Sequence, residues 1–363
     1  MKPEQLLPIL LSVNATPLPN FQSGGLLDLL HSIFPGLDPD HSDPDPIPDT
    51  PLDPGPGSDS DSIPPLAGYA LTWHDEFTTS PNNPLPASTN WLLDTGSSYP
   101  AGAPNWGNNE RQSYTTSPSN IHITPSNTLL ITPLHNQIQN QWTSARIETT
   151  RTDFLASARG KLYIEARLRT GCAPPSHQAG IWPAFWALGA SFRGDPTDWP
   201  MASEWDFVEV VNGLPTAYSA LHCGRDSNPG GPCGEYTGIG NGGVGWGCGW
   251  HVVGFEVDRS GDSDRGGGGG GGGGGGWEGE TLTWFLDGEE VHRVSGADVG
   301  DAQVWERIAH QGHFLLLNVA VGGNWPGDPD GNTRDGEEVA MEVDYVRVWN
   351  SDDSGVFGTG TDY

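Results

Sequence analysis

Three carboxylates lie close together in one short, otherwise apolar segment of the chain. Glu204, Asp206 and Glu209 fall within six residues, and the residues around them favour a β-strand. Because side chains alternate along a strand, Glu204 and Asp206 share a face whereas Glu209 points away. One inserted bulge residue between Asp206 and Glu209 would bring all three acids to the same side. Burying three acids together is costly, so we expect that side to line an open groove.

This arrangement of acids suits the hydrolysis of a glycosidic bond. One glutamate attacks the anomeric carbon, while the other protonates the leaving oxygen and then activates water. Mutual repulsion raises the pKa of one carboxyl and keeps it protonated as the acid, and Asp206 can hydrogen-bond the nucleophile. The alternative is an exposed edge strand whose charges discourage aggregation, but the intervening Trp205, Phe207 and Val208 indicate a core strand.

The segments that must position this strand predict an all-β protein. Residues 161–169 alternate between apolar and polar, as in a half-buried antiparallel strand. Residues 280–294 form two β-prone runs joined by Asp287-Gly288, which predicts a hairpin. Residues 313–321 are apolar on both faces, and residues 341–349 make a last strand. Many strands with few helical patterns indicate a β-sandwich.

Charge and composition exclude several classes of partner. The 363 residues contain 16 Lys+Arg and 46 Asp+Glu, a formal net charge of −30, so nucleic acid and anionic lipid would be repelled. There is no run of eighteen apolar residues that could span a membrane. The chain holds 15 Trp, an unusually high number for a polar, acidic protein, and their flat faces suit stacking on sugar rings.

The chain divides into a folded domain and flanking segments. Residues 1–15, with an apolar stretch from Leu6 to Val13 and small residues up to Ala15, predict a secretory signal and an extracellular protein. Residues 16–66 contain no Lys or Arg and are rich in Pro and Asp, as in a solvated linker. Residues 67–350 are the expected catalytic domain, and an acidic tail follows at 351–363. Eleven glycines at 266–276 predict a loop insertion.

The four cysteines are Cys172, Cys223, Cys233 and Cys248. An even number behind a secretory signal favours two disulfides, with three possible connectivities. A zinc site is the competing interpretation, and the absence of a Cys-x-x-Cys pair or a tight Cys/His cluster disfavours it.

Ordered motifs across residues 71–349 resemble glycoside hydrolase family 16, specifically its laminarinase-like, fungal-type endo-1,3(4)-β-glucanases. The central motif is Glu-x-Asp-x-x-Glu at 204–209, preceded by Trp-Pro-Ala-Phe-Trp at 182–186. Further matching segments are Trp-His-Asp-Glu-Phe at 73–77, Asn-Asn-Glu-Arg-Gln-Ser-Tyr at 108–114, His-Cys-Gly at 222–224 and the last strand at 341–349. The resemblance implies a β-jelly-roll sandwich of two antiparallel sheets with a concave substrate cleft.

The resemblance also implies roles for individual residues. Glu204 corresponds to the nucleophile, Asp206 to the assisting acid and Glu209 to the acid/base. The implied substrate-binding residues are Trp186, Trp199, His222, Trp325, Arg146 and Asn108. Trp182 is equally compatible with the core and with the cleft. No catalytic cofactor is required, but the family's structural calcium site would use Asp344 as its side-chain ligand.

Two residues depart from the family's pattern beside the nucleophile. Ser203 stands where the family commonly has Gly, and Trp205 stands where it usually has Ile or Leu. We expect Trp205 to point away from the carboxylates, so that it affects packing more than chemistry.

The sequence therefore predicts a secreted, monomeric, retaining endo-β-glucanase that cuts internal β-1,3 and/or β-1,4 bonds of β-glucan. A transglycosylase would use the same residues and pass the glycosyl group to a sugar instead of water. A β-glucan-binding lectin on the same fold is a third hypothesis, disfavoured because a lectin does not need both glutamates.

Overall fold

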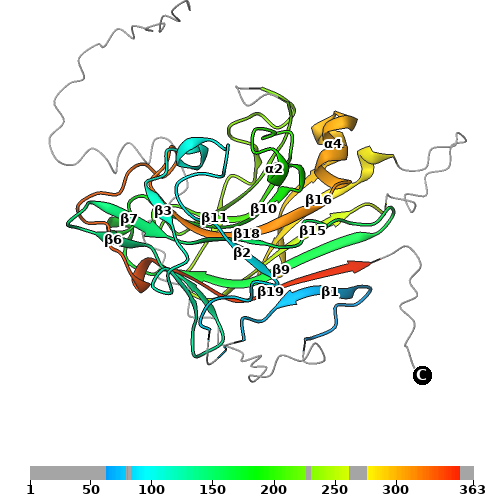
Figure 1. Ribbon diagram of the computed structural model, residues 1–363. Helices are drawn as coiled ribbons and strands as arrows, with labels where there is room; N and C mark the ends of the chain where they lie inside the picture. The colour runs from blue at the N-terminus through cyan, green and yellow to red at the C-terminus, as the bar shows by residue number, and fades with distance from the viewer. Residues whose placement is uncertain (1–62, 79, 81–82, 226–229, 261–275, 352–363) are drawn as a thin grey trace, which may run out of the picture. The chain divides into compact units, whose positions relative to one another are not determined.

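Two stacked antiparallel β-sheets form the core of the described part of the chain, as predicted, in a jelly-roll arrangement (Figure 1). The computed structural model describes residues 63–78, 80, 83–225, 230–260 and 276–351. The predicted signal peptide, nearly all of the predicted linker and acidic tail, and glycines 266–275 lie outside these residues.

The inner sheet carries the three acids on β11. Its strand order is β13 (Ile239–Gly240), β12 (Thr216–His222), β11 (Glu204–Val210), β10 (Ile181–Gly189), β18 (His313–Val321), β8 (Arg146–Thr149) and β2 (Trp91–Leu93), and β14 (Val244–Gly245) also pairs with β12. We call the face of this sheet that bears Glu204, Asp206 and Glu209 the cleft face. Its other face packs on the outer sheet.

The outer sheet lies beneath the inner one, with β9, β19 and β1 in the lower layer of Figure 1. Its order is β17 (Glu289–Ser295), β16 (Thr281–Leu286), β15 (His251–Asp258), β9 (Lys161–Thr170), β19 (Met341–Ser351), β5 (Leu129–Ile131) and β4 (Ile121–Ile123), and β1 (Ala70–Asp75) pairs with β19. A small third sheet contains β3 (Gln112–Tyr114), β7 (Gln141–Ser144) and β6 (Leu134–Asn136).

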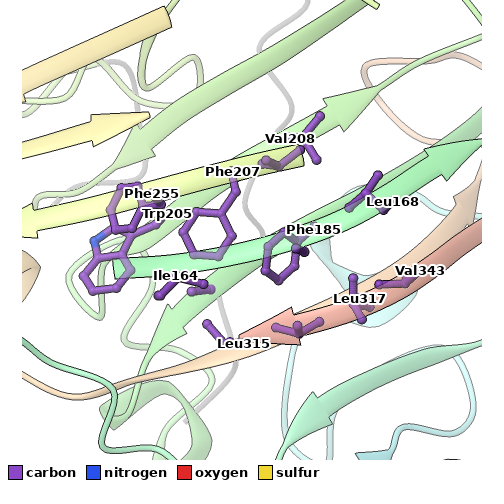
Figure 2. Packing of buried hydrophobic residues seen from close by; sticks show 14 of the residues in the cluster. Ile164, Leu168, Phe185, Trp205, Phe207, Val208, Phe255, Leu315, Leu317 and Val343 are labelled. Carbon is purple, nitrogen blue, oxygen red and sulfur yellow. The ribbon is translucent and has the colours of Figure 1, made fainter. Parts of the chain in front are cut away.

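The two large sheets meet through a core of apolar side chains (Figure 2). The rings of Trp205 and Phe207 on β11 each lie 4.9 Å from the ring of Phe255 on β15. Phe207 also lies 4.7 Å from Phe185 on β10. Burying a ring of this size stabilises the fold by about 1.5–3 kcal/mol. Because β11 is paired on both edges and buried on this face, the edge-strand interpretation of the three acids is wrong.

The strands predicted from hydrophobic patterns are confirmed. β9 buries every second residue, and β18 is buried along its whole length, as expected for a strand between two layers. β16 and β17 form the predicted hairpin. Asp287 and Gly288 have φ values of +52° and +84°, the left-handed conformation that a two-residue hairpin turn requires.

Short helices connect the strands of the described part of the chain, and none of them was predicted individually from the sequence. The short helices are α2 (Ser191–Gly194), α3 (Gly296–Val299), η2 (Pro104–Gly107), η3 (Pro175–His177), η4 (Trp277–Gly279) and η5 (Glu337–Val339). The longer α4 (Ala302–Ala309) begins at Asp301, which caps it by accepting hydrogen bonds from the backbone N–H of Gln303 and Val304. Among the described residues, no helix is long and apolar enough to cross a membrane.

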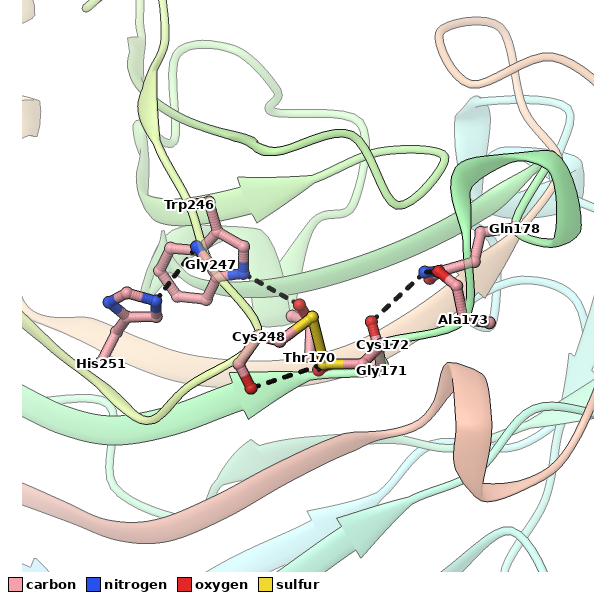
Figure 3. The surroundings of a disulfide bond; sticks show 9 residues. All are labelled: Thr170, Gly171, Cys172, Ala173, Gln178, Trp246, Gly247, Cys248 and His251. Carbon is pink, nitrogen blue, oxygen red and sulfur yellow. Dashed lines mark hydrogen bonds between the residues drawn. A yellow bond between two sulfur atoms is a disulfide. The ribbon is translucent and has the colours of Figure 1, made fainter. Parts of the chain in front are cut away.

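Two disulfides are present, as predicted, and the structure decides between the three connectivities. Cys172 pairs with Cys248 and Cys223 with Cys233. The first bond ties the residues after β9 to those before β15 (Figure 3). Beside it, Trp246 Nε1 donates a hydrogen bond of 2.9 Å to Thr170 Oγ1. The second bond lies in the loop after β12, next to the acids.

Candidate active site

The register around β11 shows how the three acids reach one face. Glu204 pairs with His222, Asp206 with Ala220 and Glu209 with Tyr218 of β12, so three steps along β11 match two along its neighbour. The pairing with β10 shifts at the same place. The predicted bulge is therefore confirmed.

The bulge brings Glu209 to the face of Glu204 because two successive residues of β11 face the core. Phe207 and Val208 are both buried, at 2% and 4% exposure. Strand alternation resumes after them with Glu209 on the side of Glu204. Trp205 lies on the opposite face, as predicted, with its ring against Phe255.

Glu204 lies on the cleft face beside an indole and another acid. Trp199 Nε1 donates a hydrogen bond of 3.1 Å to Glu204 Oε2. Burial, followed by the negative charge of Asp206, raises the pKa of Glu204 to about 8. Glu204 as a whole residue is half-buried.

Glu209 has a similar hydrogen bond from the other side of the bulge. Trp182 Nε1 donates 2.9 Å to Glu209 Oε1, which places Trp182 on the cleft face. Burial and then Asp206 raise the pKa of Glu209 well above its ordinary range. Both glutamates are thus held by tryptophan N–H groups, and both are disposed to keep a proton.

Asp206, His222 and Glu235 lie in a row, and Glu235 was not predicted as a site residue from the sequence. His222 Nε2 lies 3.3 Å from Asp206 Oδ2, and His222 Nδ1 lies 2.7 Å from Glu235 Oε2. Burial alone would lower the pKa of His222, but Asp206 and Glu235 outweigh burial and raise this pKa well above its usual value. His222 therefore lies between two carboxylates, which favour its protonated form.

Trp186 lies on the cleft face and Arg146 lies behind it. The Arg146 guanidinium is 4.7 Å from the Trp186 ring, and it also faces the rings of Tyr99 and Trp106 at 4.9 and 4.6 Å. Its Nε donates 2.9 Å to Asp94 Oδ2. Because Arg146 is only 4% exposed, the expected direct contact with substrate is not supported. Arg146 instead stabilises the position of the Trp186 ring through a cation–π contact.

Asn318 is a further polar residue of the cleft face. Its Oδ1 accepts a hydrogen bond of 2.7 Å from Trp186 Nε1, and its Nδ2 donates 3.2 Å to the Tyr114 hydroxyl. The sequence analysis missed this residue, although one amide in the otherwise apolar segment 313–321 is a signal that could have revealed it.

Aromatic rings flank the acids on both sides. Near Glu209, Trp325 is 46% exposed and lies edge-on to Trp182 at 5.7 Å and to Tyr218 at 5.1 Å. Near Glu204, the ring of Tyr236 stacks on Trp199 at 6.0 Å and is 66% exposed. Tyr236 carries no sequence signal because it lies in a loop.

Asn108 lies in an exposed loop next to the segment that carries Trp325. Its backbone carbonyl accepts a hydrogen bond of 2.7 Å from Asn324 N, and its side chain lies near Glu110, with Nδ2 3.4 Å from Oε1. The contacts bring it to the Trp325 side of the site. Its role in substrate binding stays a prediction.

Ser203, directly before Glu204, has a backbone conformation that favours glycine. Its φ is +70°, in the left-handed region that side chains disfavour. His313 Nδ1 donates 3.1 Å to the Gln311 carbonyl, so Nε2 is the acceptor for the Ser203 hydroxyl at 3.3 Å. The His313 ring in turn stacks on Trp205 at 3.5 Å. Both departures from the family pattern therefore meet at one buried histidine.

The surroundings of Asp344 do not fit its expected role as a calcium ligand. Asp344 Oδ2 lies 2.8 Å from Arg167 Nη1, so a cationic side chain already neutralises this carboxylate. Glu204, Asp206 and His222 form the one cluster of at least three His, Cys, Asp or Glu side chains in the described part of the chain with metal-ligand spacing. Its side chains already have partners, since His222 lies between Asp206 and Glu235 and Glu204 accepts a hydrogen bond from Trp199.

Comparison with known proteins places the chain in a family. No protein-family model matches the sequence. The crystal structure of an endo-1,3-beta-glucanase from Streptomyces sioyaensis is 38% identical, with a TM-score of 0.71, over 80% of this chain and 99% of that one. The sequence of a glucan endo-1,3-beta-glucosidase A1 from Niallia circulans is 28% identical over 79% of this chain, and that of a beta-glucanase from Rhodothermus marinus is 27% identical over 81%.

These similarities define the class of the protein. The chain belongs to glycoside hydrolase family 16, and it has the fold of the family's glucanases. It covers 88% of the Rhodothermus protein but only 38% of the Niallia one. The chain therefore spans less than half of the Niallia protein.

Proposed function

We propose that this chain is a secreted, monomeric, retaining endo-β-glucanase that hydrolyses internal β-1,3 and/or β-1,4 bonds of β-glucan without a cofactor. The observation that carries the proposal is the bulge in β11, which presents Glu204 and Glu209 on one face with Asp206 between them. The names of the relatives support a β-1,3-glucan as substrate. The fungal-type placement within the family rests on the sequence motifs and is part of the proposal.

In the first step, the Glu204 carboxylate attacks the anomeric carbon while the Glu209 carboxylic acid protonates the departing glycosidic oxygen. The bond from the anomeric carbon to that oxygen breaks as the ester bond to Glu204 forms. Glu204 must be ionised for this step although its pKa is raised. The imidazolium of His222 assists, because the Glu204, Asp206 and His222 ligand atoms all lie within 4.8 Å of one another.

In the second step, Glu209 is ionised and removes a proton from water, which attacks the same carbon and releases Glu204. The two inversions restore the β configuration. The raised pKa of Glu209 suits both roles, since it is protonated when a leaving group needs an acid and is basic enough to activate water.

Glucose units are held by the aromatic rings along the cleft. Trp186, Trp199 and Trp325 are proposed to stack on sugar faces, with His222 and Asn108 as polar contacts. Arg146 keeps Trp186 in place, since its guanidinium lies 4.7 Å from that ring.

Release of reducing sugar from laminarin, lichenan, xyloglucan and xylan, measured side by side, tests the substrate. We expect hydrolysis of laminarin or lichenan with internal cleavage, unchanged by a chelator. Proton NMR in the first minutes should show the β-anomer of the new reducing end. An initial α-anomer would contradict the retaining mechanism, and products longer than a laminari-oligosaccharide substrate would indicate a transglycosylase. Binding without cleavage would indicate the lectin.

A further inference from the structure

We propose that Glu235 is a positioning residue of this active site, which holds His222 as an imidazolium beside Asp206 and thereby favours ionisation of Glu204. The inference rests on the proposed function, because it assigns a role within that reaction. Glu235 lies two residues after Cys233, in a loop rather than on the sheet.

The contacts of Glu235 leave neither carboxylate oxygen free. Oε2 lies 2.7 Å from His222 Nδ1, and Oε1 accepts a hydrogen bond of 2.8 Å from the backbone N–H of Cys223. The side chain has 0% exposure. A buried carboxylate without a counter-charge would cost several kcal/mol. The stable arrangement is therefore a Glu235 anion against a His222 cation.

The charges around His222 come from two elements. Asp206 and Glu204 face it from β11, Glu235 faces it from the disulfide loop, and the Trp199 ring lies 5.9 Å away. The Oδ2 atom of Asp206 is buried and receives no well-aligned hydrogen bond, so the imidazolium at 3.3 Å compensates its charge. Without that cation, Glu204 would have to ionise beside an uncompensated anion.

The Cys223–Cys233 disulfide closes the loop that delivers Glu235. Cys223 is both a partner of this bond and the residue whose N–H binds the Glu235 carboxylate. The next residue, Tyr236, stacks on Trp199, whose indole donates to Glu204. Glu235 therefore acts on Glu204 electrostatically through His222, and Tyr236 acts on it by packing against Trp199.

The test is Glu235→Gln, which keeps the shape and removes the charge, in the full-length protein. The matched control is Glu280→Gln. Glu280 also binds a histidine, with His310 Nε2 2.5 Å from its Oε2, and a tryptophan, with Trp305 Nε1 2.7 Å away, but it contacts none of the three acids. The readouts are the ¹⁵N shifts of the His222 ring, the pH profile of kcat/KM and the melting temperature.

We expect His222 to be protonated on both ring nitrogens at pH 7 in the native protein and to titrate at lower pH in Glu235→Gln. The charge of Glu235 itself raises the pKa of Glu204, but by less than His222 lowers it. Loss of the His222 charge should therefore raise the pKa of Glu204 on balance, so the acidic limb of the kcat/KM profile moves up by about one pH unit and kcat/KM below the limb falls roughly tenfold. Glu280→Gln should lower the melting temperature and leave the limb in place.

Three results would overturn the inference: a neutral His222 in the native protein, an unchanged His222 titration in Glu235→Gln, or an unmoved limb with only a lower melting temperature. The NMR readout needs no activity, so a failed inference and a failed glucanase proposal are distinguishable. If Glu235→Gln does not fold, Glu235→Asp keeps the charge but withdraws it, and the same titration must then move in the same direction by a smaller amount.

Discussion

The two glutamates of β11 share a face, a strand and a tryptophan hydrogen bond, yet their surroundings differ. Glu204 lies in a cluster with Asp206 and the His222 cation, which is anchored by Glu235. Glu209 lies outside that cluster, with the indole of Trp182 as its hydrogen-bond donor. A nucleophile must lose its proton and an acid must keep one. Burial is the largest cause of the raised pKa of both glutamates, and His222 lowers the pKa of both. The difference lies in their neighbours, because His222 clusters with Glu204 and Asp206 whereas Glu209 lies outside that cluster.

The largest expected effect comes from removing either glutamate. Glu204→Gln should lower kcat by roughly 10³-fold or more while binding is retained, because an amide cannot attack the anomeric carbon. In Glu209→Ala, azide should restore turnover of an aryl β-glucoside with a good leaving group, since such a group needs no acid.

The product of azide rescue distinguishes the two residues. Azide that attacks the covalent intermediate in Glu209→Ala gives a β-glucosyl azide, whereas direct displacement in Glu204→Ala gives the α-anomer. Proton NMR of the products checks this, and reversed anomers would exchange the two roles.

A smaller effect is expected from the two tryptophan donors. Each indole N–H stabilises the ionised form of its carboxylate, so removing it raises the carboxyl's pKa. Trp199→Phe should move the acidic limb of kcat/KM to higher pH, and Trp182→Phe should move the basic limb to higher pH, each by roughly half to one unit. If the same limb moved in both variants, Trp199 and Trp182 would not act on different carboxyl groups.

The smallest effect concerns stability. The pKa of Glu204 is raised from 4.5 to about 8 in the folded protein, so the native state binds a proton that the unfolded state releases. This contribution is fully present below pH 4.5 and is lost as the pH rises to about 8. Glu204→Gln should therefore melt at the native temperature at pH 4 and at a higher temperature than the native protein at pH 8. A gain at pH 4 that disappears at pH 8 would contradict the assignment.

Much of the fold was predictable because its signals are local. The alternation in β9, the apolar run in β18 and the Asp287-Gly288 turn each depend on residues within ten positions of one another. The bulge was equally legible, since three acids in one core strand can share a face only if one residue is inserted. The helix α4 was missed, although Asp301 and the spacing of Val304 and Ile308 signal it.

By itself, the sequence predicted three acids as candidates for the chemistry and determined the bulge that brings them to one face, because both follow from residue type and spacing along one strand. Only the tertiary structure decided the position of His222 between two carboxylates, the burial of Arg146, the pairing of the cysteines and the place of Trp182. Each of these depends on partners distant in the chain or in a loop without periodicity. Charged groups, aromatic rings and sulfur atoms interact only when they lie close together in space, and the packing of the two sheets determines which of them do.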